Sequence, residues 1–432
     1  MPPEDDYKPQ IRFYYGGKEV SSPDTFWATV GKWLGEITER QIGNYKEVKD
    51  LALQAAGSES DPEKKLRKLY ARAQQLRNIS FEHSRGLEEI KKEGLKPGGN
   101  LADVVKHGYG DHNDINRLFV GLARAAGFDA AMVWASNRET TSFRNEILSV
   151  RQLDSAIATV NLNGKGLFLD PGTKYCPFGL IRWMRTSVPA LAVSKGGGVL
   201  TTIPATTPDD SVVHRVANMS LDAGGSLKGE LTLELSGEEA LEHRLDALQT
   251  DETGRAKEFE HEILKLLPSG ASVKLQDVQG WQESEKPLIA RFSVEVPEFA
   301  SVARKRLIVP AGVFQTQTKN AFVHEMRTYP IAFPYSSTEL DDTNIKIPPG
   351  YTLESPAHPY QMKLYYATYQ TSFTFEDNRI KSKRILSLNG VHFGPEQYSQ
   401  LKGFFNVVQV GDGAQAVLQE SEAANSKKQD QP

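Results

Sequence analysis

The sequence is poor in cysteine: Cys176 is the only one among 432 residues. Intramolecular disulfides and cysteine-rich metal sites are therefore excluded. The sequence also lacks a run of about 18 apolar residues, the length that a transmembrane helix requires, so no transmembrane segment is expected. The first ten residues are polar and have neither the basic nor the apolar region of a signal peptide, so the sequence as written carries no export signal.

An excess of charge of one sign is lacking too. Lys and Arg total 51 and Asp and Glu total 55, which gives a net charge of −4. This balance excludes a strongly basic nucleic-acid binder and a general attraction to anionic membranes. The composition, 39% hydrophobic and 25% charged, is typical of a globular protein. At roughly 150 residues per domain, the length predicts two to four domains.

Helical patterns come first in the chain and are followed by strand patterns. Apolar residues at helical spacing predict helices over 25–42, from Ser60 onwards and over 113–126. The Ser60 helix begins with a capping box, Ser-Asp-Pro-Glu. Asn163-Gly164 is typical of a tight hairpin turn, so 156–162 and 166–170 are expected to pair. Further expectations are a strand over 11–15, a loop over 94–100 and a strand over 128–135.

Alternating strand patterns dominate the second half of the chain. The glycines of 195–198 and the prolines of 204–208 are expected to connect two domains. Beyond them, strands are expected over 229–235, 288–296, 363–375 and 379–388, with helices over 253–267 and 396–407. The expected organisation is a lead-in over 1–58, a helix-and-sheet domain over 59–200, a β-rich domain with one helix over 205–330, a β-rich domain over 331–418, and a disordered tail over 419–432.

The strongest helix begins at a position suited to chemistry. Residues 108–114 read Gly-Tyr-Gly-Asp-His-Asn-Asp and lie just before or within its first turn. A helix N-terminus presents unpaired amide donors and a positive dipole, which lower the pKa of a thiol nucleophile placed there. In this sequence the position holds His112 instead of a cysteine.

These residues carry a family resemblance. The sequence resembles bacterial transglutaminase-like domains over roughly residues 60–190. The resemblance lies in the 108–114 motif, the helix that ends in Ala-Ala-Gly at 125–127, and the later segments Ala156-Ile157 and Leu169-Asp170-Pro171. The resemblance implies a papain-like fold with a Cys-His-Asp triad. The fold class is therefore expected to be α+β, a papain-like domain followed by two β-rich domains.

The flanking regions resemble bacterial multidomain proteins of the same type, and 347–418 resembles their closing domain. In those proteins a β domain of unknown function precedes the transglutaminase-like domain. That domain would lie before Met1, so the chain is expected to be a version without it. Proteins of this architecture are usually extracytoplasmic, whereas this sequence begins without a signal peptide.

The resemblance places His112 at the cysteine position, Ser155 at the histidine position and Asp170 at the aspartate position. Two of the three reactive groups are therefore replaced. A histidine cannot form the acyl-thioester of the family reaction, and a serine cannot act as a base near neutral pH. The sequence predicts a catalytically inactive protein with a binding or scaffolding role, a protein or peptide partner, and no cofactor, metal or nucleic acid.

Two active alternatives stay open. Ser155 could be the nucleophile with His112 as its base; Asp170 would then contact the serine position, and His112 would depend on Asp111 or Asp114 for orientation. Alternatively, His107, His112 and the two aspartates could hold a metal ion. The simpler interpretation of Asp111 and Asp114 is that they cap the helix.

Cys176 and the tyrosine-rich segment 365–369 each have two interpretations. Cys176 could be a displaced nucleophile, but a proline follows it, and a buried structural thiol is the simpler interpretation. Tyr365 and Tyr369 are expected on one face of a strand with Tyr366 on the other, where they could stack on a ligand or pack within a sheet.

Overall fold

A computed structural model describes residues 2–3, 6–8, 11, 22–82, 99–194, 196–315 and 322–421. The chain divides into two compact units, Met1–Thr206 with Arg244–Gln249 and Thr207–His243 with Thr250–Pro432. Most of the strand expected over 11–15, the loop over 94–100 and the tail lies outside the described residues. None of the described helices combines the length and apolar character needed to span a lipid bilayer.

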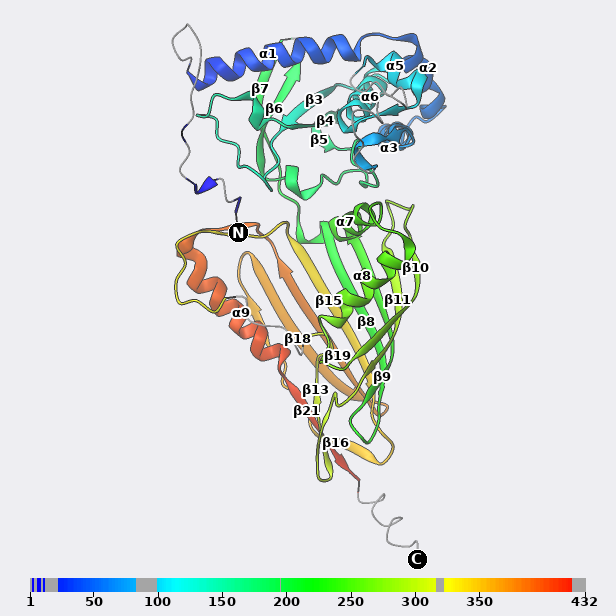
Figure 1. Cartoon of the computed structure of the whole chain (residues 1–432), viewed down its shortest axis with the longest axis vertical. Coiled ribbons are helices and arrows are strands. Elements are labelled where there is room, and N and C mark those ends of the chain that lie inside the picture. Colours follow the sequence, from blue (N-terminus) through cyan, green and yellow to red (C-terminus); the bar gives the residue numbers. More distant parts are fainter. Residues whose placement is uncertain are drawn as a thin grey trace, which may run out of the picture. The chain divides into compact units, whose positions relative to one another are not determined.

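The first unit is built on a five-stranded antiparallel sheet of order β5-β4-β3-β6-β7 (Figure 1). The predicted hairpin is present: Asn163 and Gly164 join β4 and β5 with positive φ angles of 54° and 83°. Residues 197–203, which begin within the expected connection, instead form β7. The strands are β3 (Ala130–Ala135), β4 (Ser155–Leu162), β5 (Lys165–Leu169), β6 (Val188–Ser194) and β7 (Gly197–Ile203).

Helices pack on one face of this sheet and share a single apolar core with it. The core includes α1 and α2, so the expected lead-in is part of the same folded unit. α6 is buried along most of its length because its apolar residues recur at helical spacing. The helices are α1 (Pro23–Ile42), α2 (Lys46–Ala56), α3 (Pro62–Gln74), α5 (Leu101–His107) and α6 (His112–Ala125).

Two local details position these helices. Asp61, not Ser60, caps α3, because its Oδ1 accepts the backbone N–H of Lys64 at 2.8 Å. The prediction of Ser60 as the cap was wrong by one residue. Along α1, Gly31 lies against Gly198 of β7, so closely that a Cβ on either residue would overlap the backbone of the other. This contact lets α1 pack directly on the sheet.

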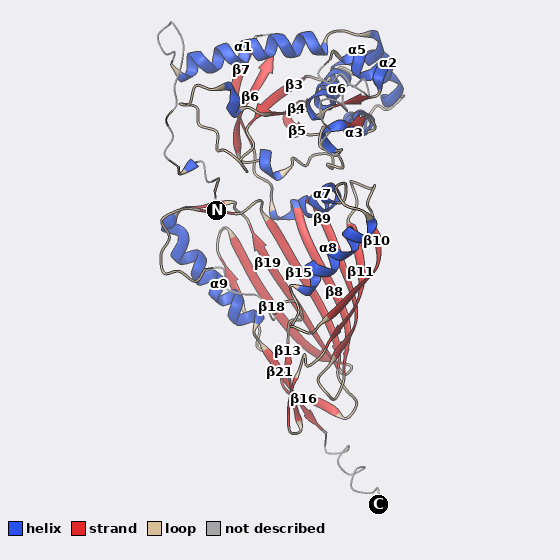
Figure 2. Cartoon of the chain, viewed as in Figure 1, coloured by secondary structure: helices blue, strands red, loops and turns tan. Residues whose placement is uncertain are grey.

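The second unit contains an eight-stranded sheet of order β10-β11-β9-β8-β15-β19-β18-β17 (Figure 2). All its pairings are antiparallel except the central one between β8 and β15. The strands are β8 (Ser211–Leu221), β9 (Leu227–Gly237), β10 (Ser272–Gln279), β11 (Leu288–Val296), β15 (Ser337–Lys346), β17 (Gln361–Lys363), β18 (Ala367–Glu376) and β19 (Arg379–Leu388).

Smaller elements complete this unit. A four-stranded sheet of order β12-β13-β21-β16 contributes to the same core as much of the large sheet. The elements are β12 (Ser301–Ala303), β13 (Arg306–Pro310), β16 (Tyr351–Ser355), β21 (Gln415–Glu420), the pair β14 (Ile331–Ala332) and β20 (His392–Phe393), and the helices α8 (Glu252–Leu264) and α9 (Tyr398–Asp412). The helix α7 (Glu238–Asp246) begins in this unit, and its residues from Arg244 onwards belong to the first unit.

The second unit corrects three expectations. The border expected at residue 330 separates β8 from β15, which are hydrogen-bonded neighbours, so both β-rich regions belong to one sheet. The region expected to hold one helix holds two, α7 and α8. The tail does not begin at 419, because Gln419 and Glu420 pair with neighbouring strands in β21.

Candidate functional site

The first turn of α6 sets the geometry of the candidate site. Asp111 Oδ1 accepts the backbone N–H of Asp114 at 2.7 Å, and Asp114 Oδ2 accepts the backbone N–H of Asp111 at 3.2 Å. This reciprocal capping box fixes where the helix starts. His112 is therefore the first residue of α6. It is buried, and its backbone N–H donates to Oγ of Ser80 at 2.9 Å.

The His112 ring faces a buried carboxylate. Nε2 of His112 lies 2.8 Å from Oδ1 of Asp170, which directly follows β5 and is fully buried. Asn116, one turn further along α6, donates from Nδ2 to the same oxygen at 2.9 Å and to the backbone oxygen of Ala156 at 2.8 Å. Its Oδ1 accepts the backbone N–H of Gly172 at 3.0 Å. One asparagine thus ties α6 to β4 and to the turn after β5.

Arg185 links the remaining member of the predicted set to this network. Its Nε donates to Oγ of Ser155 at 2.6 Å, and its Nη1 donates to Oδ2 of Asp170 at 3.0 Å. Thr173 donates its hydroxyl to the same Oδ2 at 2.6 Å. The structure therefore brings His112, Ser155 and Asp170 into one buried cluster, with the Arg185 guanidinium between the serine and the aspartate.

Asn116 and Arg185 belong to this cluster although no sequence motif points to them. A signal for Asn116 exists, since it is a polar residue four positions after His112 on the otherwise apolar face of α6. No comparable signal marks Arg185. It lies in a short 3-10 turn, Trp183–Arg185, whose position against the sheet is set by tertiary packing alone.

The charges of the cluster compensate one another. Burial alone would raise the pKa of Asp170, but the charges of His112 and Arg185 and the hydrogen bonds from His112 and Thr173 hold that pKa well below its usual range. Asp170 is therefore an ionised acceptor. Nδ1 of His112 faces Oδ1 of Asn113 at 3.3 Å. Both ring nitrogens of His112 are therefore engaged by side chains of the cluster.

These contacts differ from those of a triad in which Ser155 is the nucleophile and His112 is its base. Asp170 contacts His112 directly, whereas it reaches Ser155 only through Arg185. The expectation that, in such a triad, Asp170 would contact the serine position and leave His112 to Asp111 or Asp114 was therefore wrong. Within the described ranges, no hydrogen bond joins Ser155 to His112, so the serine hydroxyl does not face an imidazole base as a catalytic serine requires.

The other candidate residues have structural environments. In the described part of the chain, no group of three or more His, Cys, Asp or Glu side chains is placed to hold a metal ion. His107 stacks on Tyr109 with ring centroids 5.6 Å apart. Cys176 is fully buried, and its Sγ donates to the backbone oxygen of Leu180 at 3.2 Å. This is the structural thiol that the simpler interpretation predicts.

The tyrosine-rich segment does not form one continuous strand face. Tyr365 precedes β18 and is exposed, whereas Tyr366 and Tyr369 are buried. Tyr369 donates its hydroxyl to Oδ1 of Asp412 at 2.8 Å. The expectation that Tyr365 and Tyr369 share one face was wrong, because β18 begins only at Ala367.

Sequence comparison assigns the region that holds this cluster. The transglutaminase-like superfamily matches residues 49–169. The chain contains a transglutaminase-like domain. His112 and Ser155 lie within the matched residues, and Asp170 follows their last residue. A domain of unknown function, DUF3858, matches residues 305–418 in the second unit. The α+β fold class is that of a transglutaminase-like domain followed by a β-rich domain.

Comparison with solved structures gives distant similarities. A candidate protease from Parabacteroides distasonis is 12% identical, with a TM-score of 0.49 and coverage of 90% of this chain and 58% of that protein. The chain thus spans little more than half the length of that protein. A structure of the Rad4/XPC nucleotide excision repair complex is 14% identical, with a TM-score of 0.22 and coverage of 40% of this chain and 46% of that one. No curated protein matches the sequence.

The transglutaminase-like domain thus carries an ion network where the family resemblance implies reactive groups. The network places the His112 ring and the Arg185 guanidinium around one buried carboxylate, with His112 at the start of α6. Its donors and acceptors are directed at one another. The arrangement can hold α6, β4 and the 183–185 turn together.

Proposed function

We propose that the chain is a catalytically inactive transglutaminase-like protein with a binding or scaffolding role. The observation that carries the proposal is the Arg185 guanidinium, which lies within hydrogen-bond distance of both Ser155 and Asp170. A histidine at position 155 would need the same space to reach Asp170. In this proposal Ser155 stands at the position of the family's base, and Arg185 fills the space that the base would need.

The location of the only thiol, Cys176, supports the same proposal. Thiol chemistry requires an accessible thiolate, and Cys176 is fully buried with its thiol directed at a backbone oxygen. The position that would carry the nucleophile holds His112, whose ring is paired with Asp170. Neither group can form the acyl-thioester on which the family reaction depends.

One geometric feature favours an active alternative, a serine-dependent acyltransferase or amide hydrolase. The His112–Asp170 pair is the orienting half of a catalytic triad, and Ser155 belongs to the same cluster. Two contacts argue against this alternative. Arg185 donates a hydrogen bond to the serine oxygen. The two ring nitrogens of His112 face Asp170 and Asn113, and neither faces Ser155.

Covalent labelling tests the proposal directly. Purified full-length protein is incubated with a fluorescent fluorophosphonate, beside the Ser155→Ala variant and an unrelated serine hydrolase as the positive control. We expect equal, background labelling of the wild type and the variant. Labelling of the wild type that disappears in Ser155→Ala, or covalent capture of a glutamine peptide, would establish the active alternative and overturn the proposal.

A further inference from the structure

The strand β7 is an open edge of the first sheet. It pairs with β6 on one side, and no other strand in the described ranges pairs with it. Its sequence, Gly-Gly-Val-Leu-Thr-Thr-Ile, contains no charge and no proline, the devices by which proteins usually protect such an edge. Val199 and Leu200 are 69% and 40% exposed. An apolar, uncharged edge of this kind presents backbone donors and acceptors to a further strand.

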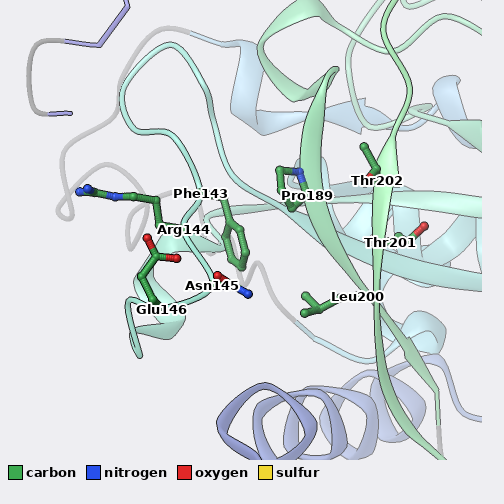
Figure 3. Close-up of a pocket in the computed structure, with 8 residues that line it drawn as sticks. All are labelled: Phe143, Arg144, Asn145, Glu146, Pro189, Leu200, Thr201 and Thr202. Atoms are coloured by element: carbon green, nitrogen blue, oxygen red, sulfur yellow. The ribbon is translucent and has the colours of Figure 1, made fainter. Parts of the chain in front are cut away.

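A pocket of about 350 Å³ lies beside this edge. One wall comes from β6 and β7, with Pro189, Leu200 and Thr202, and the other comes from residues 143–146. Residues 143–147 are here named the strap. In Figure 3 the Phe143 ring lies on the side of the strap that faces the strands, and the Arg144 side chain extends away from them. The volume is at the lower end of the range for ligand pockets, roughly 300–1,000 Å³.

Buried side chains fix the backbone of the strap. Gln152 is buried; its Oε1 accepts the N–H of Arg144 at 3.0 Å, and its Nε2 donates to the backbone oxygens of Arg144 and Ile147 at 3.0 and 2.8 Å. Trp27 of α1 donates from Nε1 to the backbone oxygen of Asn145 at 2.8 Å. The pocket wall is therefore preformed, and little ordering is needed when a ligand binds.

The fixed strap presents charges of both signs at the rim of the pocket. Arg144 and Glu146 are both exposed and are two residues apart on this backbone. A pocket with Phe143, Pro189 and Leu200 in its walls, an open strand edge, and one exposed residue of each charge match one kind of occupant. That occupant is an extended peptide with an apolar side chain and flanking charged residues, which pairs with Glu146 and Arg144 through its basic and acidic groups.

We propose that β7, the strap and the pocket between them form a docking site for such a peptide, which adds as a sixth strand at the β7 edge. The site is separate from the His112 cluster. Ser155, Ala135, Ala190 and Thr201 are successive partners across four neighbouring strands, so Thr201 lies about 14 Å from Ser155 at roughly 4.8 Å per strand. The inference rests on the proposed binding role and names the partner class.

Selection from a peptide library tests the site. Phage-displayed dodecapeptides are selected on the full-length protein and counter-selected on Leu200→Thr, a variant that keeps a strand-forming residue. A selected peptide is labelled with fluorescein and titrated by fluorescence anisotropy. We expect about tenfold weaker binding to Leu200→Thr and to Arg144→Glu. We also expect loss of binding when alternate peptide amides are N-methylated. Met326→Thr, at an exposed apolar residue of the second unit, is the matched control.

Three outcomes would overturn the docking site. In the first, the selection enriches no peptide that binds the wild type better than Leu200→Thr. In the second, N-methylation of the peptide does not weaken its binding. In the third, light scattering shows a concentration-dependent dimer of the wild type that is absent in Leu200→Thr. The last would assign the edge to a second copy of the chain. None of them depends on labelling of Ser155, so failure of the docking site and failure of the inactive-protein proposal are distinguishable.

Discussion

Nε of Arg185 donates a hydrogen bond to Oγ of Ser155 at 2.6 Å, inside a cluster from which water is largely excluded. The same guanidinium pairs with Asp170. Because its side chain is small, Ser155 leaves room for Arg185. The arginine in turn supplies the positive charge that the buried carboxylate of Asp170 needs. The two residues form one structural device, and a change at either position acts through the other.

Reactivation of the thiol site is expected to need three substitutions. Without loss of Arg185, the histidine of a His112→Cys, Ser155→His double variant has no space beside Asp170. The triple variant, which adds Arg185→Ala, is expected to react with iodoacetamide about tenfold faster than the double variant at pH 7, because a neighbouring imidazole stabilises the thiolate. Wild-type protein, with only buried Cys176, gives the background rate. Equal rates for the double and triple variants would contradict this role of Arg185.

The acid stability of the first unit should depend on Asp170. The pKa of this carboxyl in the folded protein is lowered from an unfolded value of about 3.9, so its stabilising effect is complete above that pH and is lost as the pH falls towards the folded pKa. The free energy of unfolding of the wild type should therefore fall more between pH 4 and pH 2 than that of Asp170→Asn, measured by urea denaturation.

The control for this experiment is Asp50→Asn. Asp50 pairs with Lys46 on the surface, and solvent screening leaves such an exposed pair little effect on stability. Its pH dependence should follow the wild type. Parallel curves for the wild type and Asp170→Asn would show that the buried network does not account for the acid sensitivity.

Two helical glycines should respond to alanine with opposite signs. Gly403 in α9 has open space where a Cβ would lie, so Gly403→Ala should raise the free energy of unfolding by about 0.5–1 kcal/mol. Gly31 in α1 lies against the backbone of Gly198, so Gly31→Ala should lower it by about 1–3 kcal/mol, as overpacking does. Chemical denaturation measures both changes. Stabilisation by Gly31→Ala would show that α1 does not pack this closely on β7.

The stability of the second unit should fall at alkaline pH through His243. Burial alone would lower the pKa of His243, but its hydrogen bond to Glu262, 2.9 Å long, and the charge of that group raise the pKa to about 9. The charged ring therefore stabilises the folded state fully below about pH 6.5, the unfolded pKa, and this effect is lost as the pH rises through 9.

The His243→Gln variant tests this titration. Its deficit in unfolding free energy relative to the wild type should be largest at pH 6 and should disappear by pH 10, with chemical denaturation as the measurement. A deficit that stays constant across this range would mean that His243 contributes through packing against Phe259 rather than through charge.

Local signals explain what the sequence predicts well. The capping box of Asp111 and Asp114 and the Asn163-Gly164 turn depend on residues that are neighbours in the chain, and both are confirmed. Arg185 could not be predicted in the same way. It meets Ser155 across 30 positions, and nothing in the sequence around either residue specifies that contact. The sequence therefore predicts that His112, Ser155 and Asp170 come together, but it does not predict that Arg185 joins them.

The large sheet was predictable strand by strand but not as a whole. Alternating residues identify β9, β11 and β19 because period-two patterns are local. The parallel pairing of β8 with β15 joins segments more than a hundred residues apart, for example Val212 with Thr338. No turn connects them and no short-range pattern encodes the pairing. The expected border at 330 followed from that missing information.

The β8–β15 pairing also means that the segment matched by the family model is smaller than the segment that folds as one sheet. The DUF3858 match begins at residue 305, so it contains β15, β19, β18 and β17 but not β8, β9, β10 or β11. A fragment restricted to the match would expose the edge of β15 that pairs with β8 and would lack 19 of the 30 buried residues of the apolar core that the two regions share. Such a fragment should self-associate instead of folding. The segment that matches the family model therefore needs β8 to β11, which precede it in the chain, to complete its sheet.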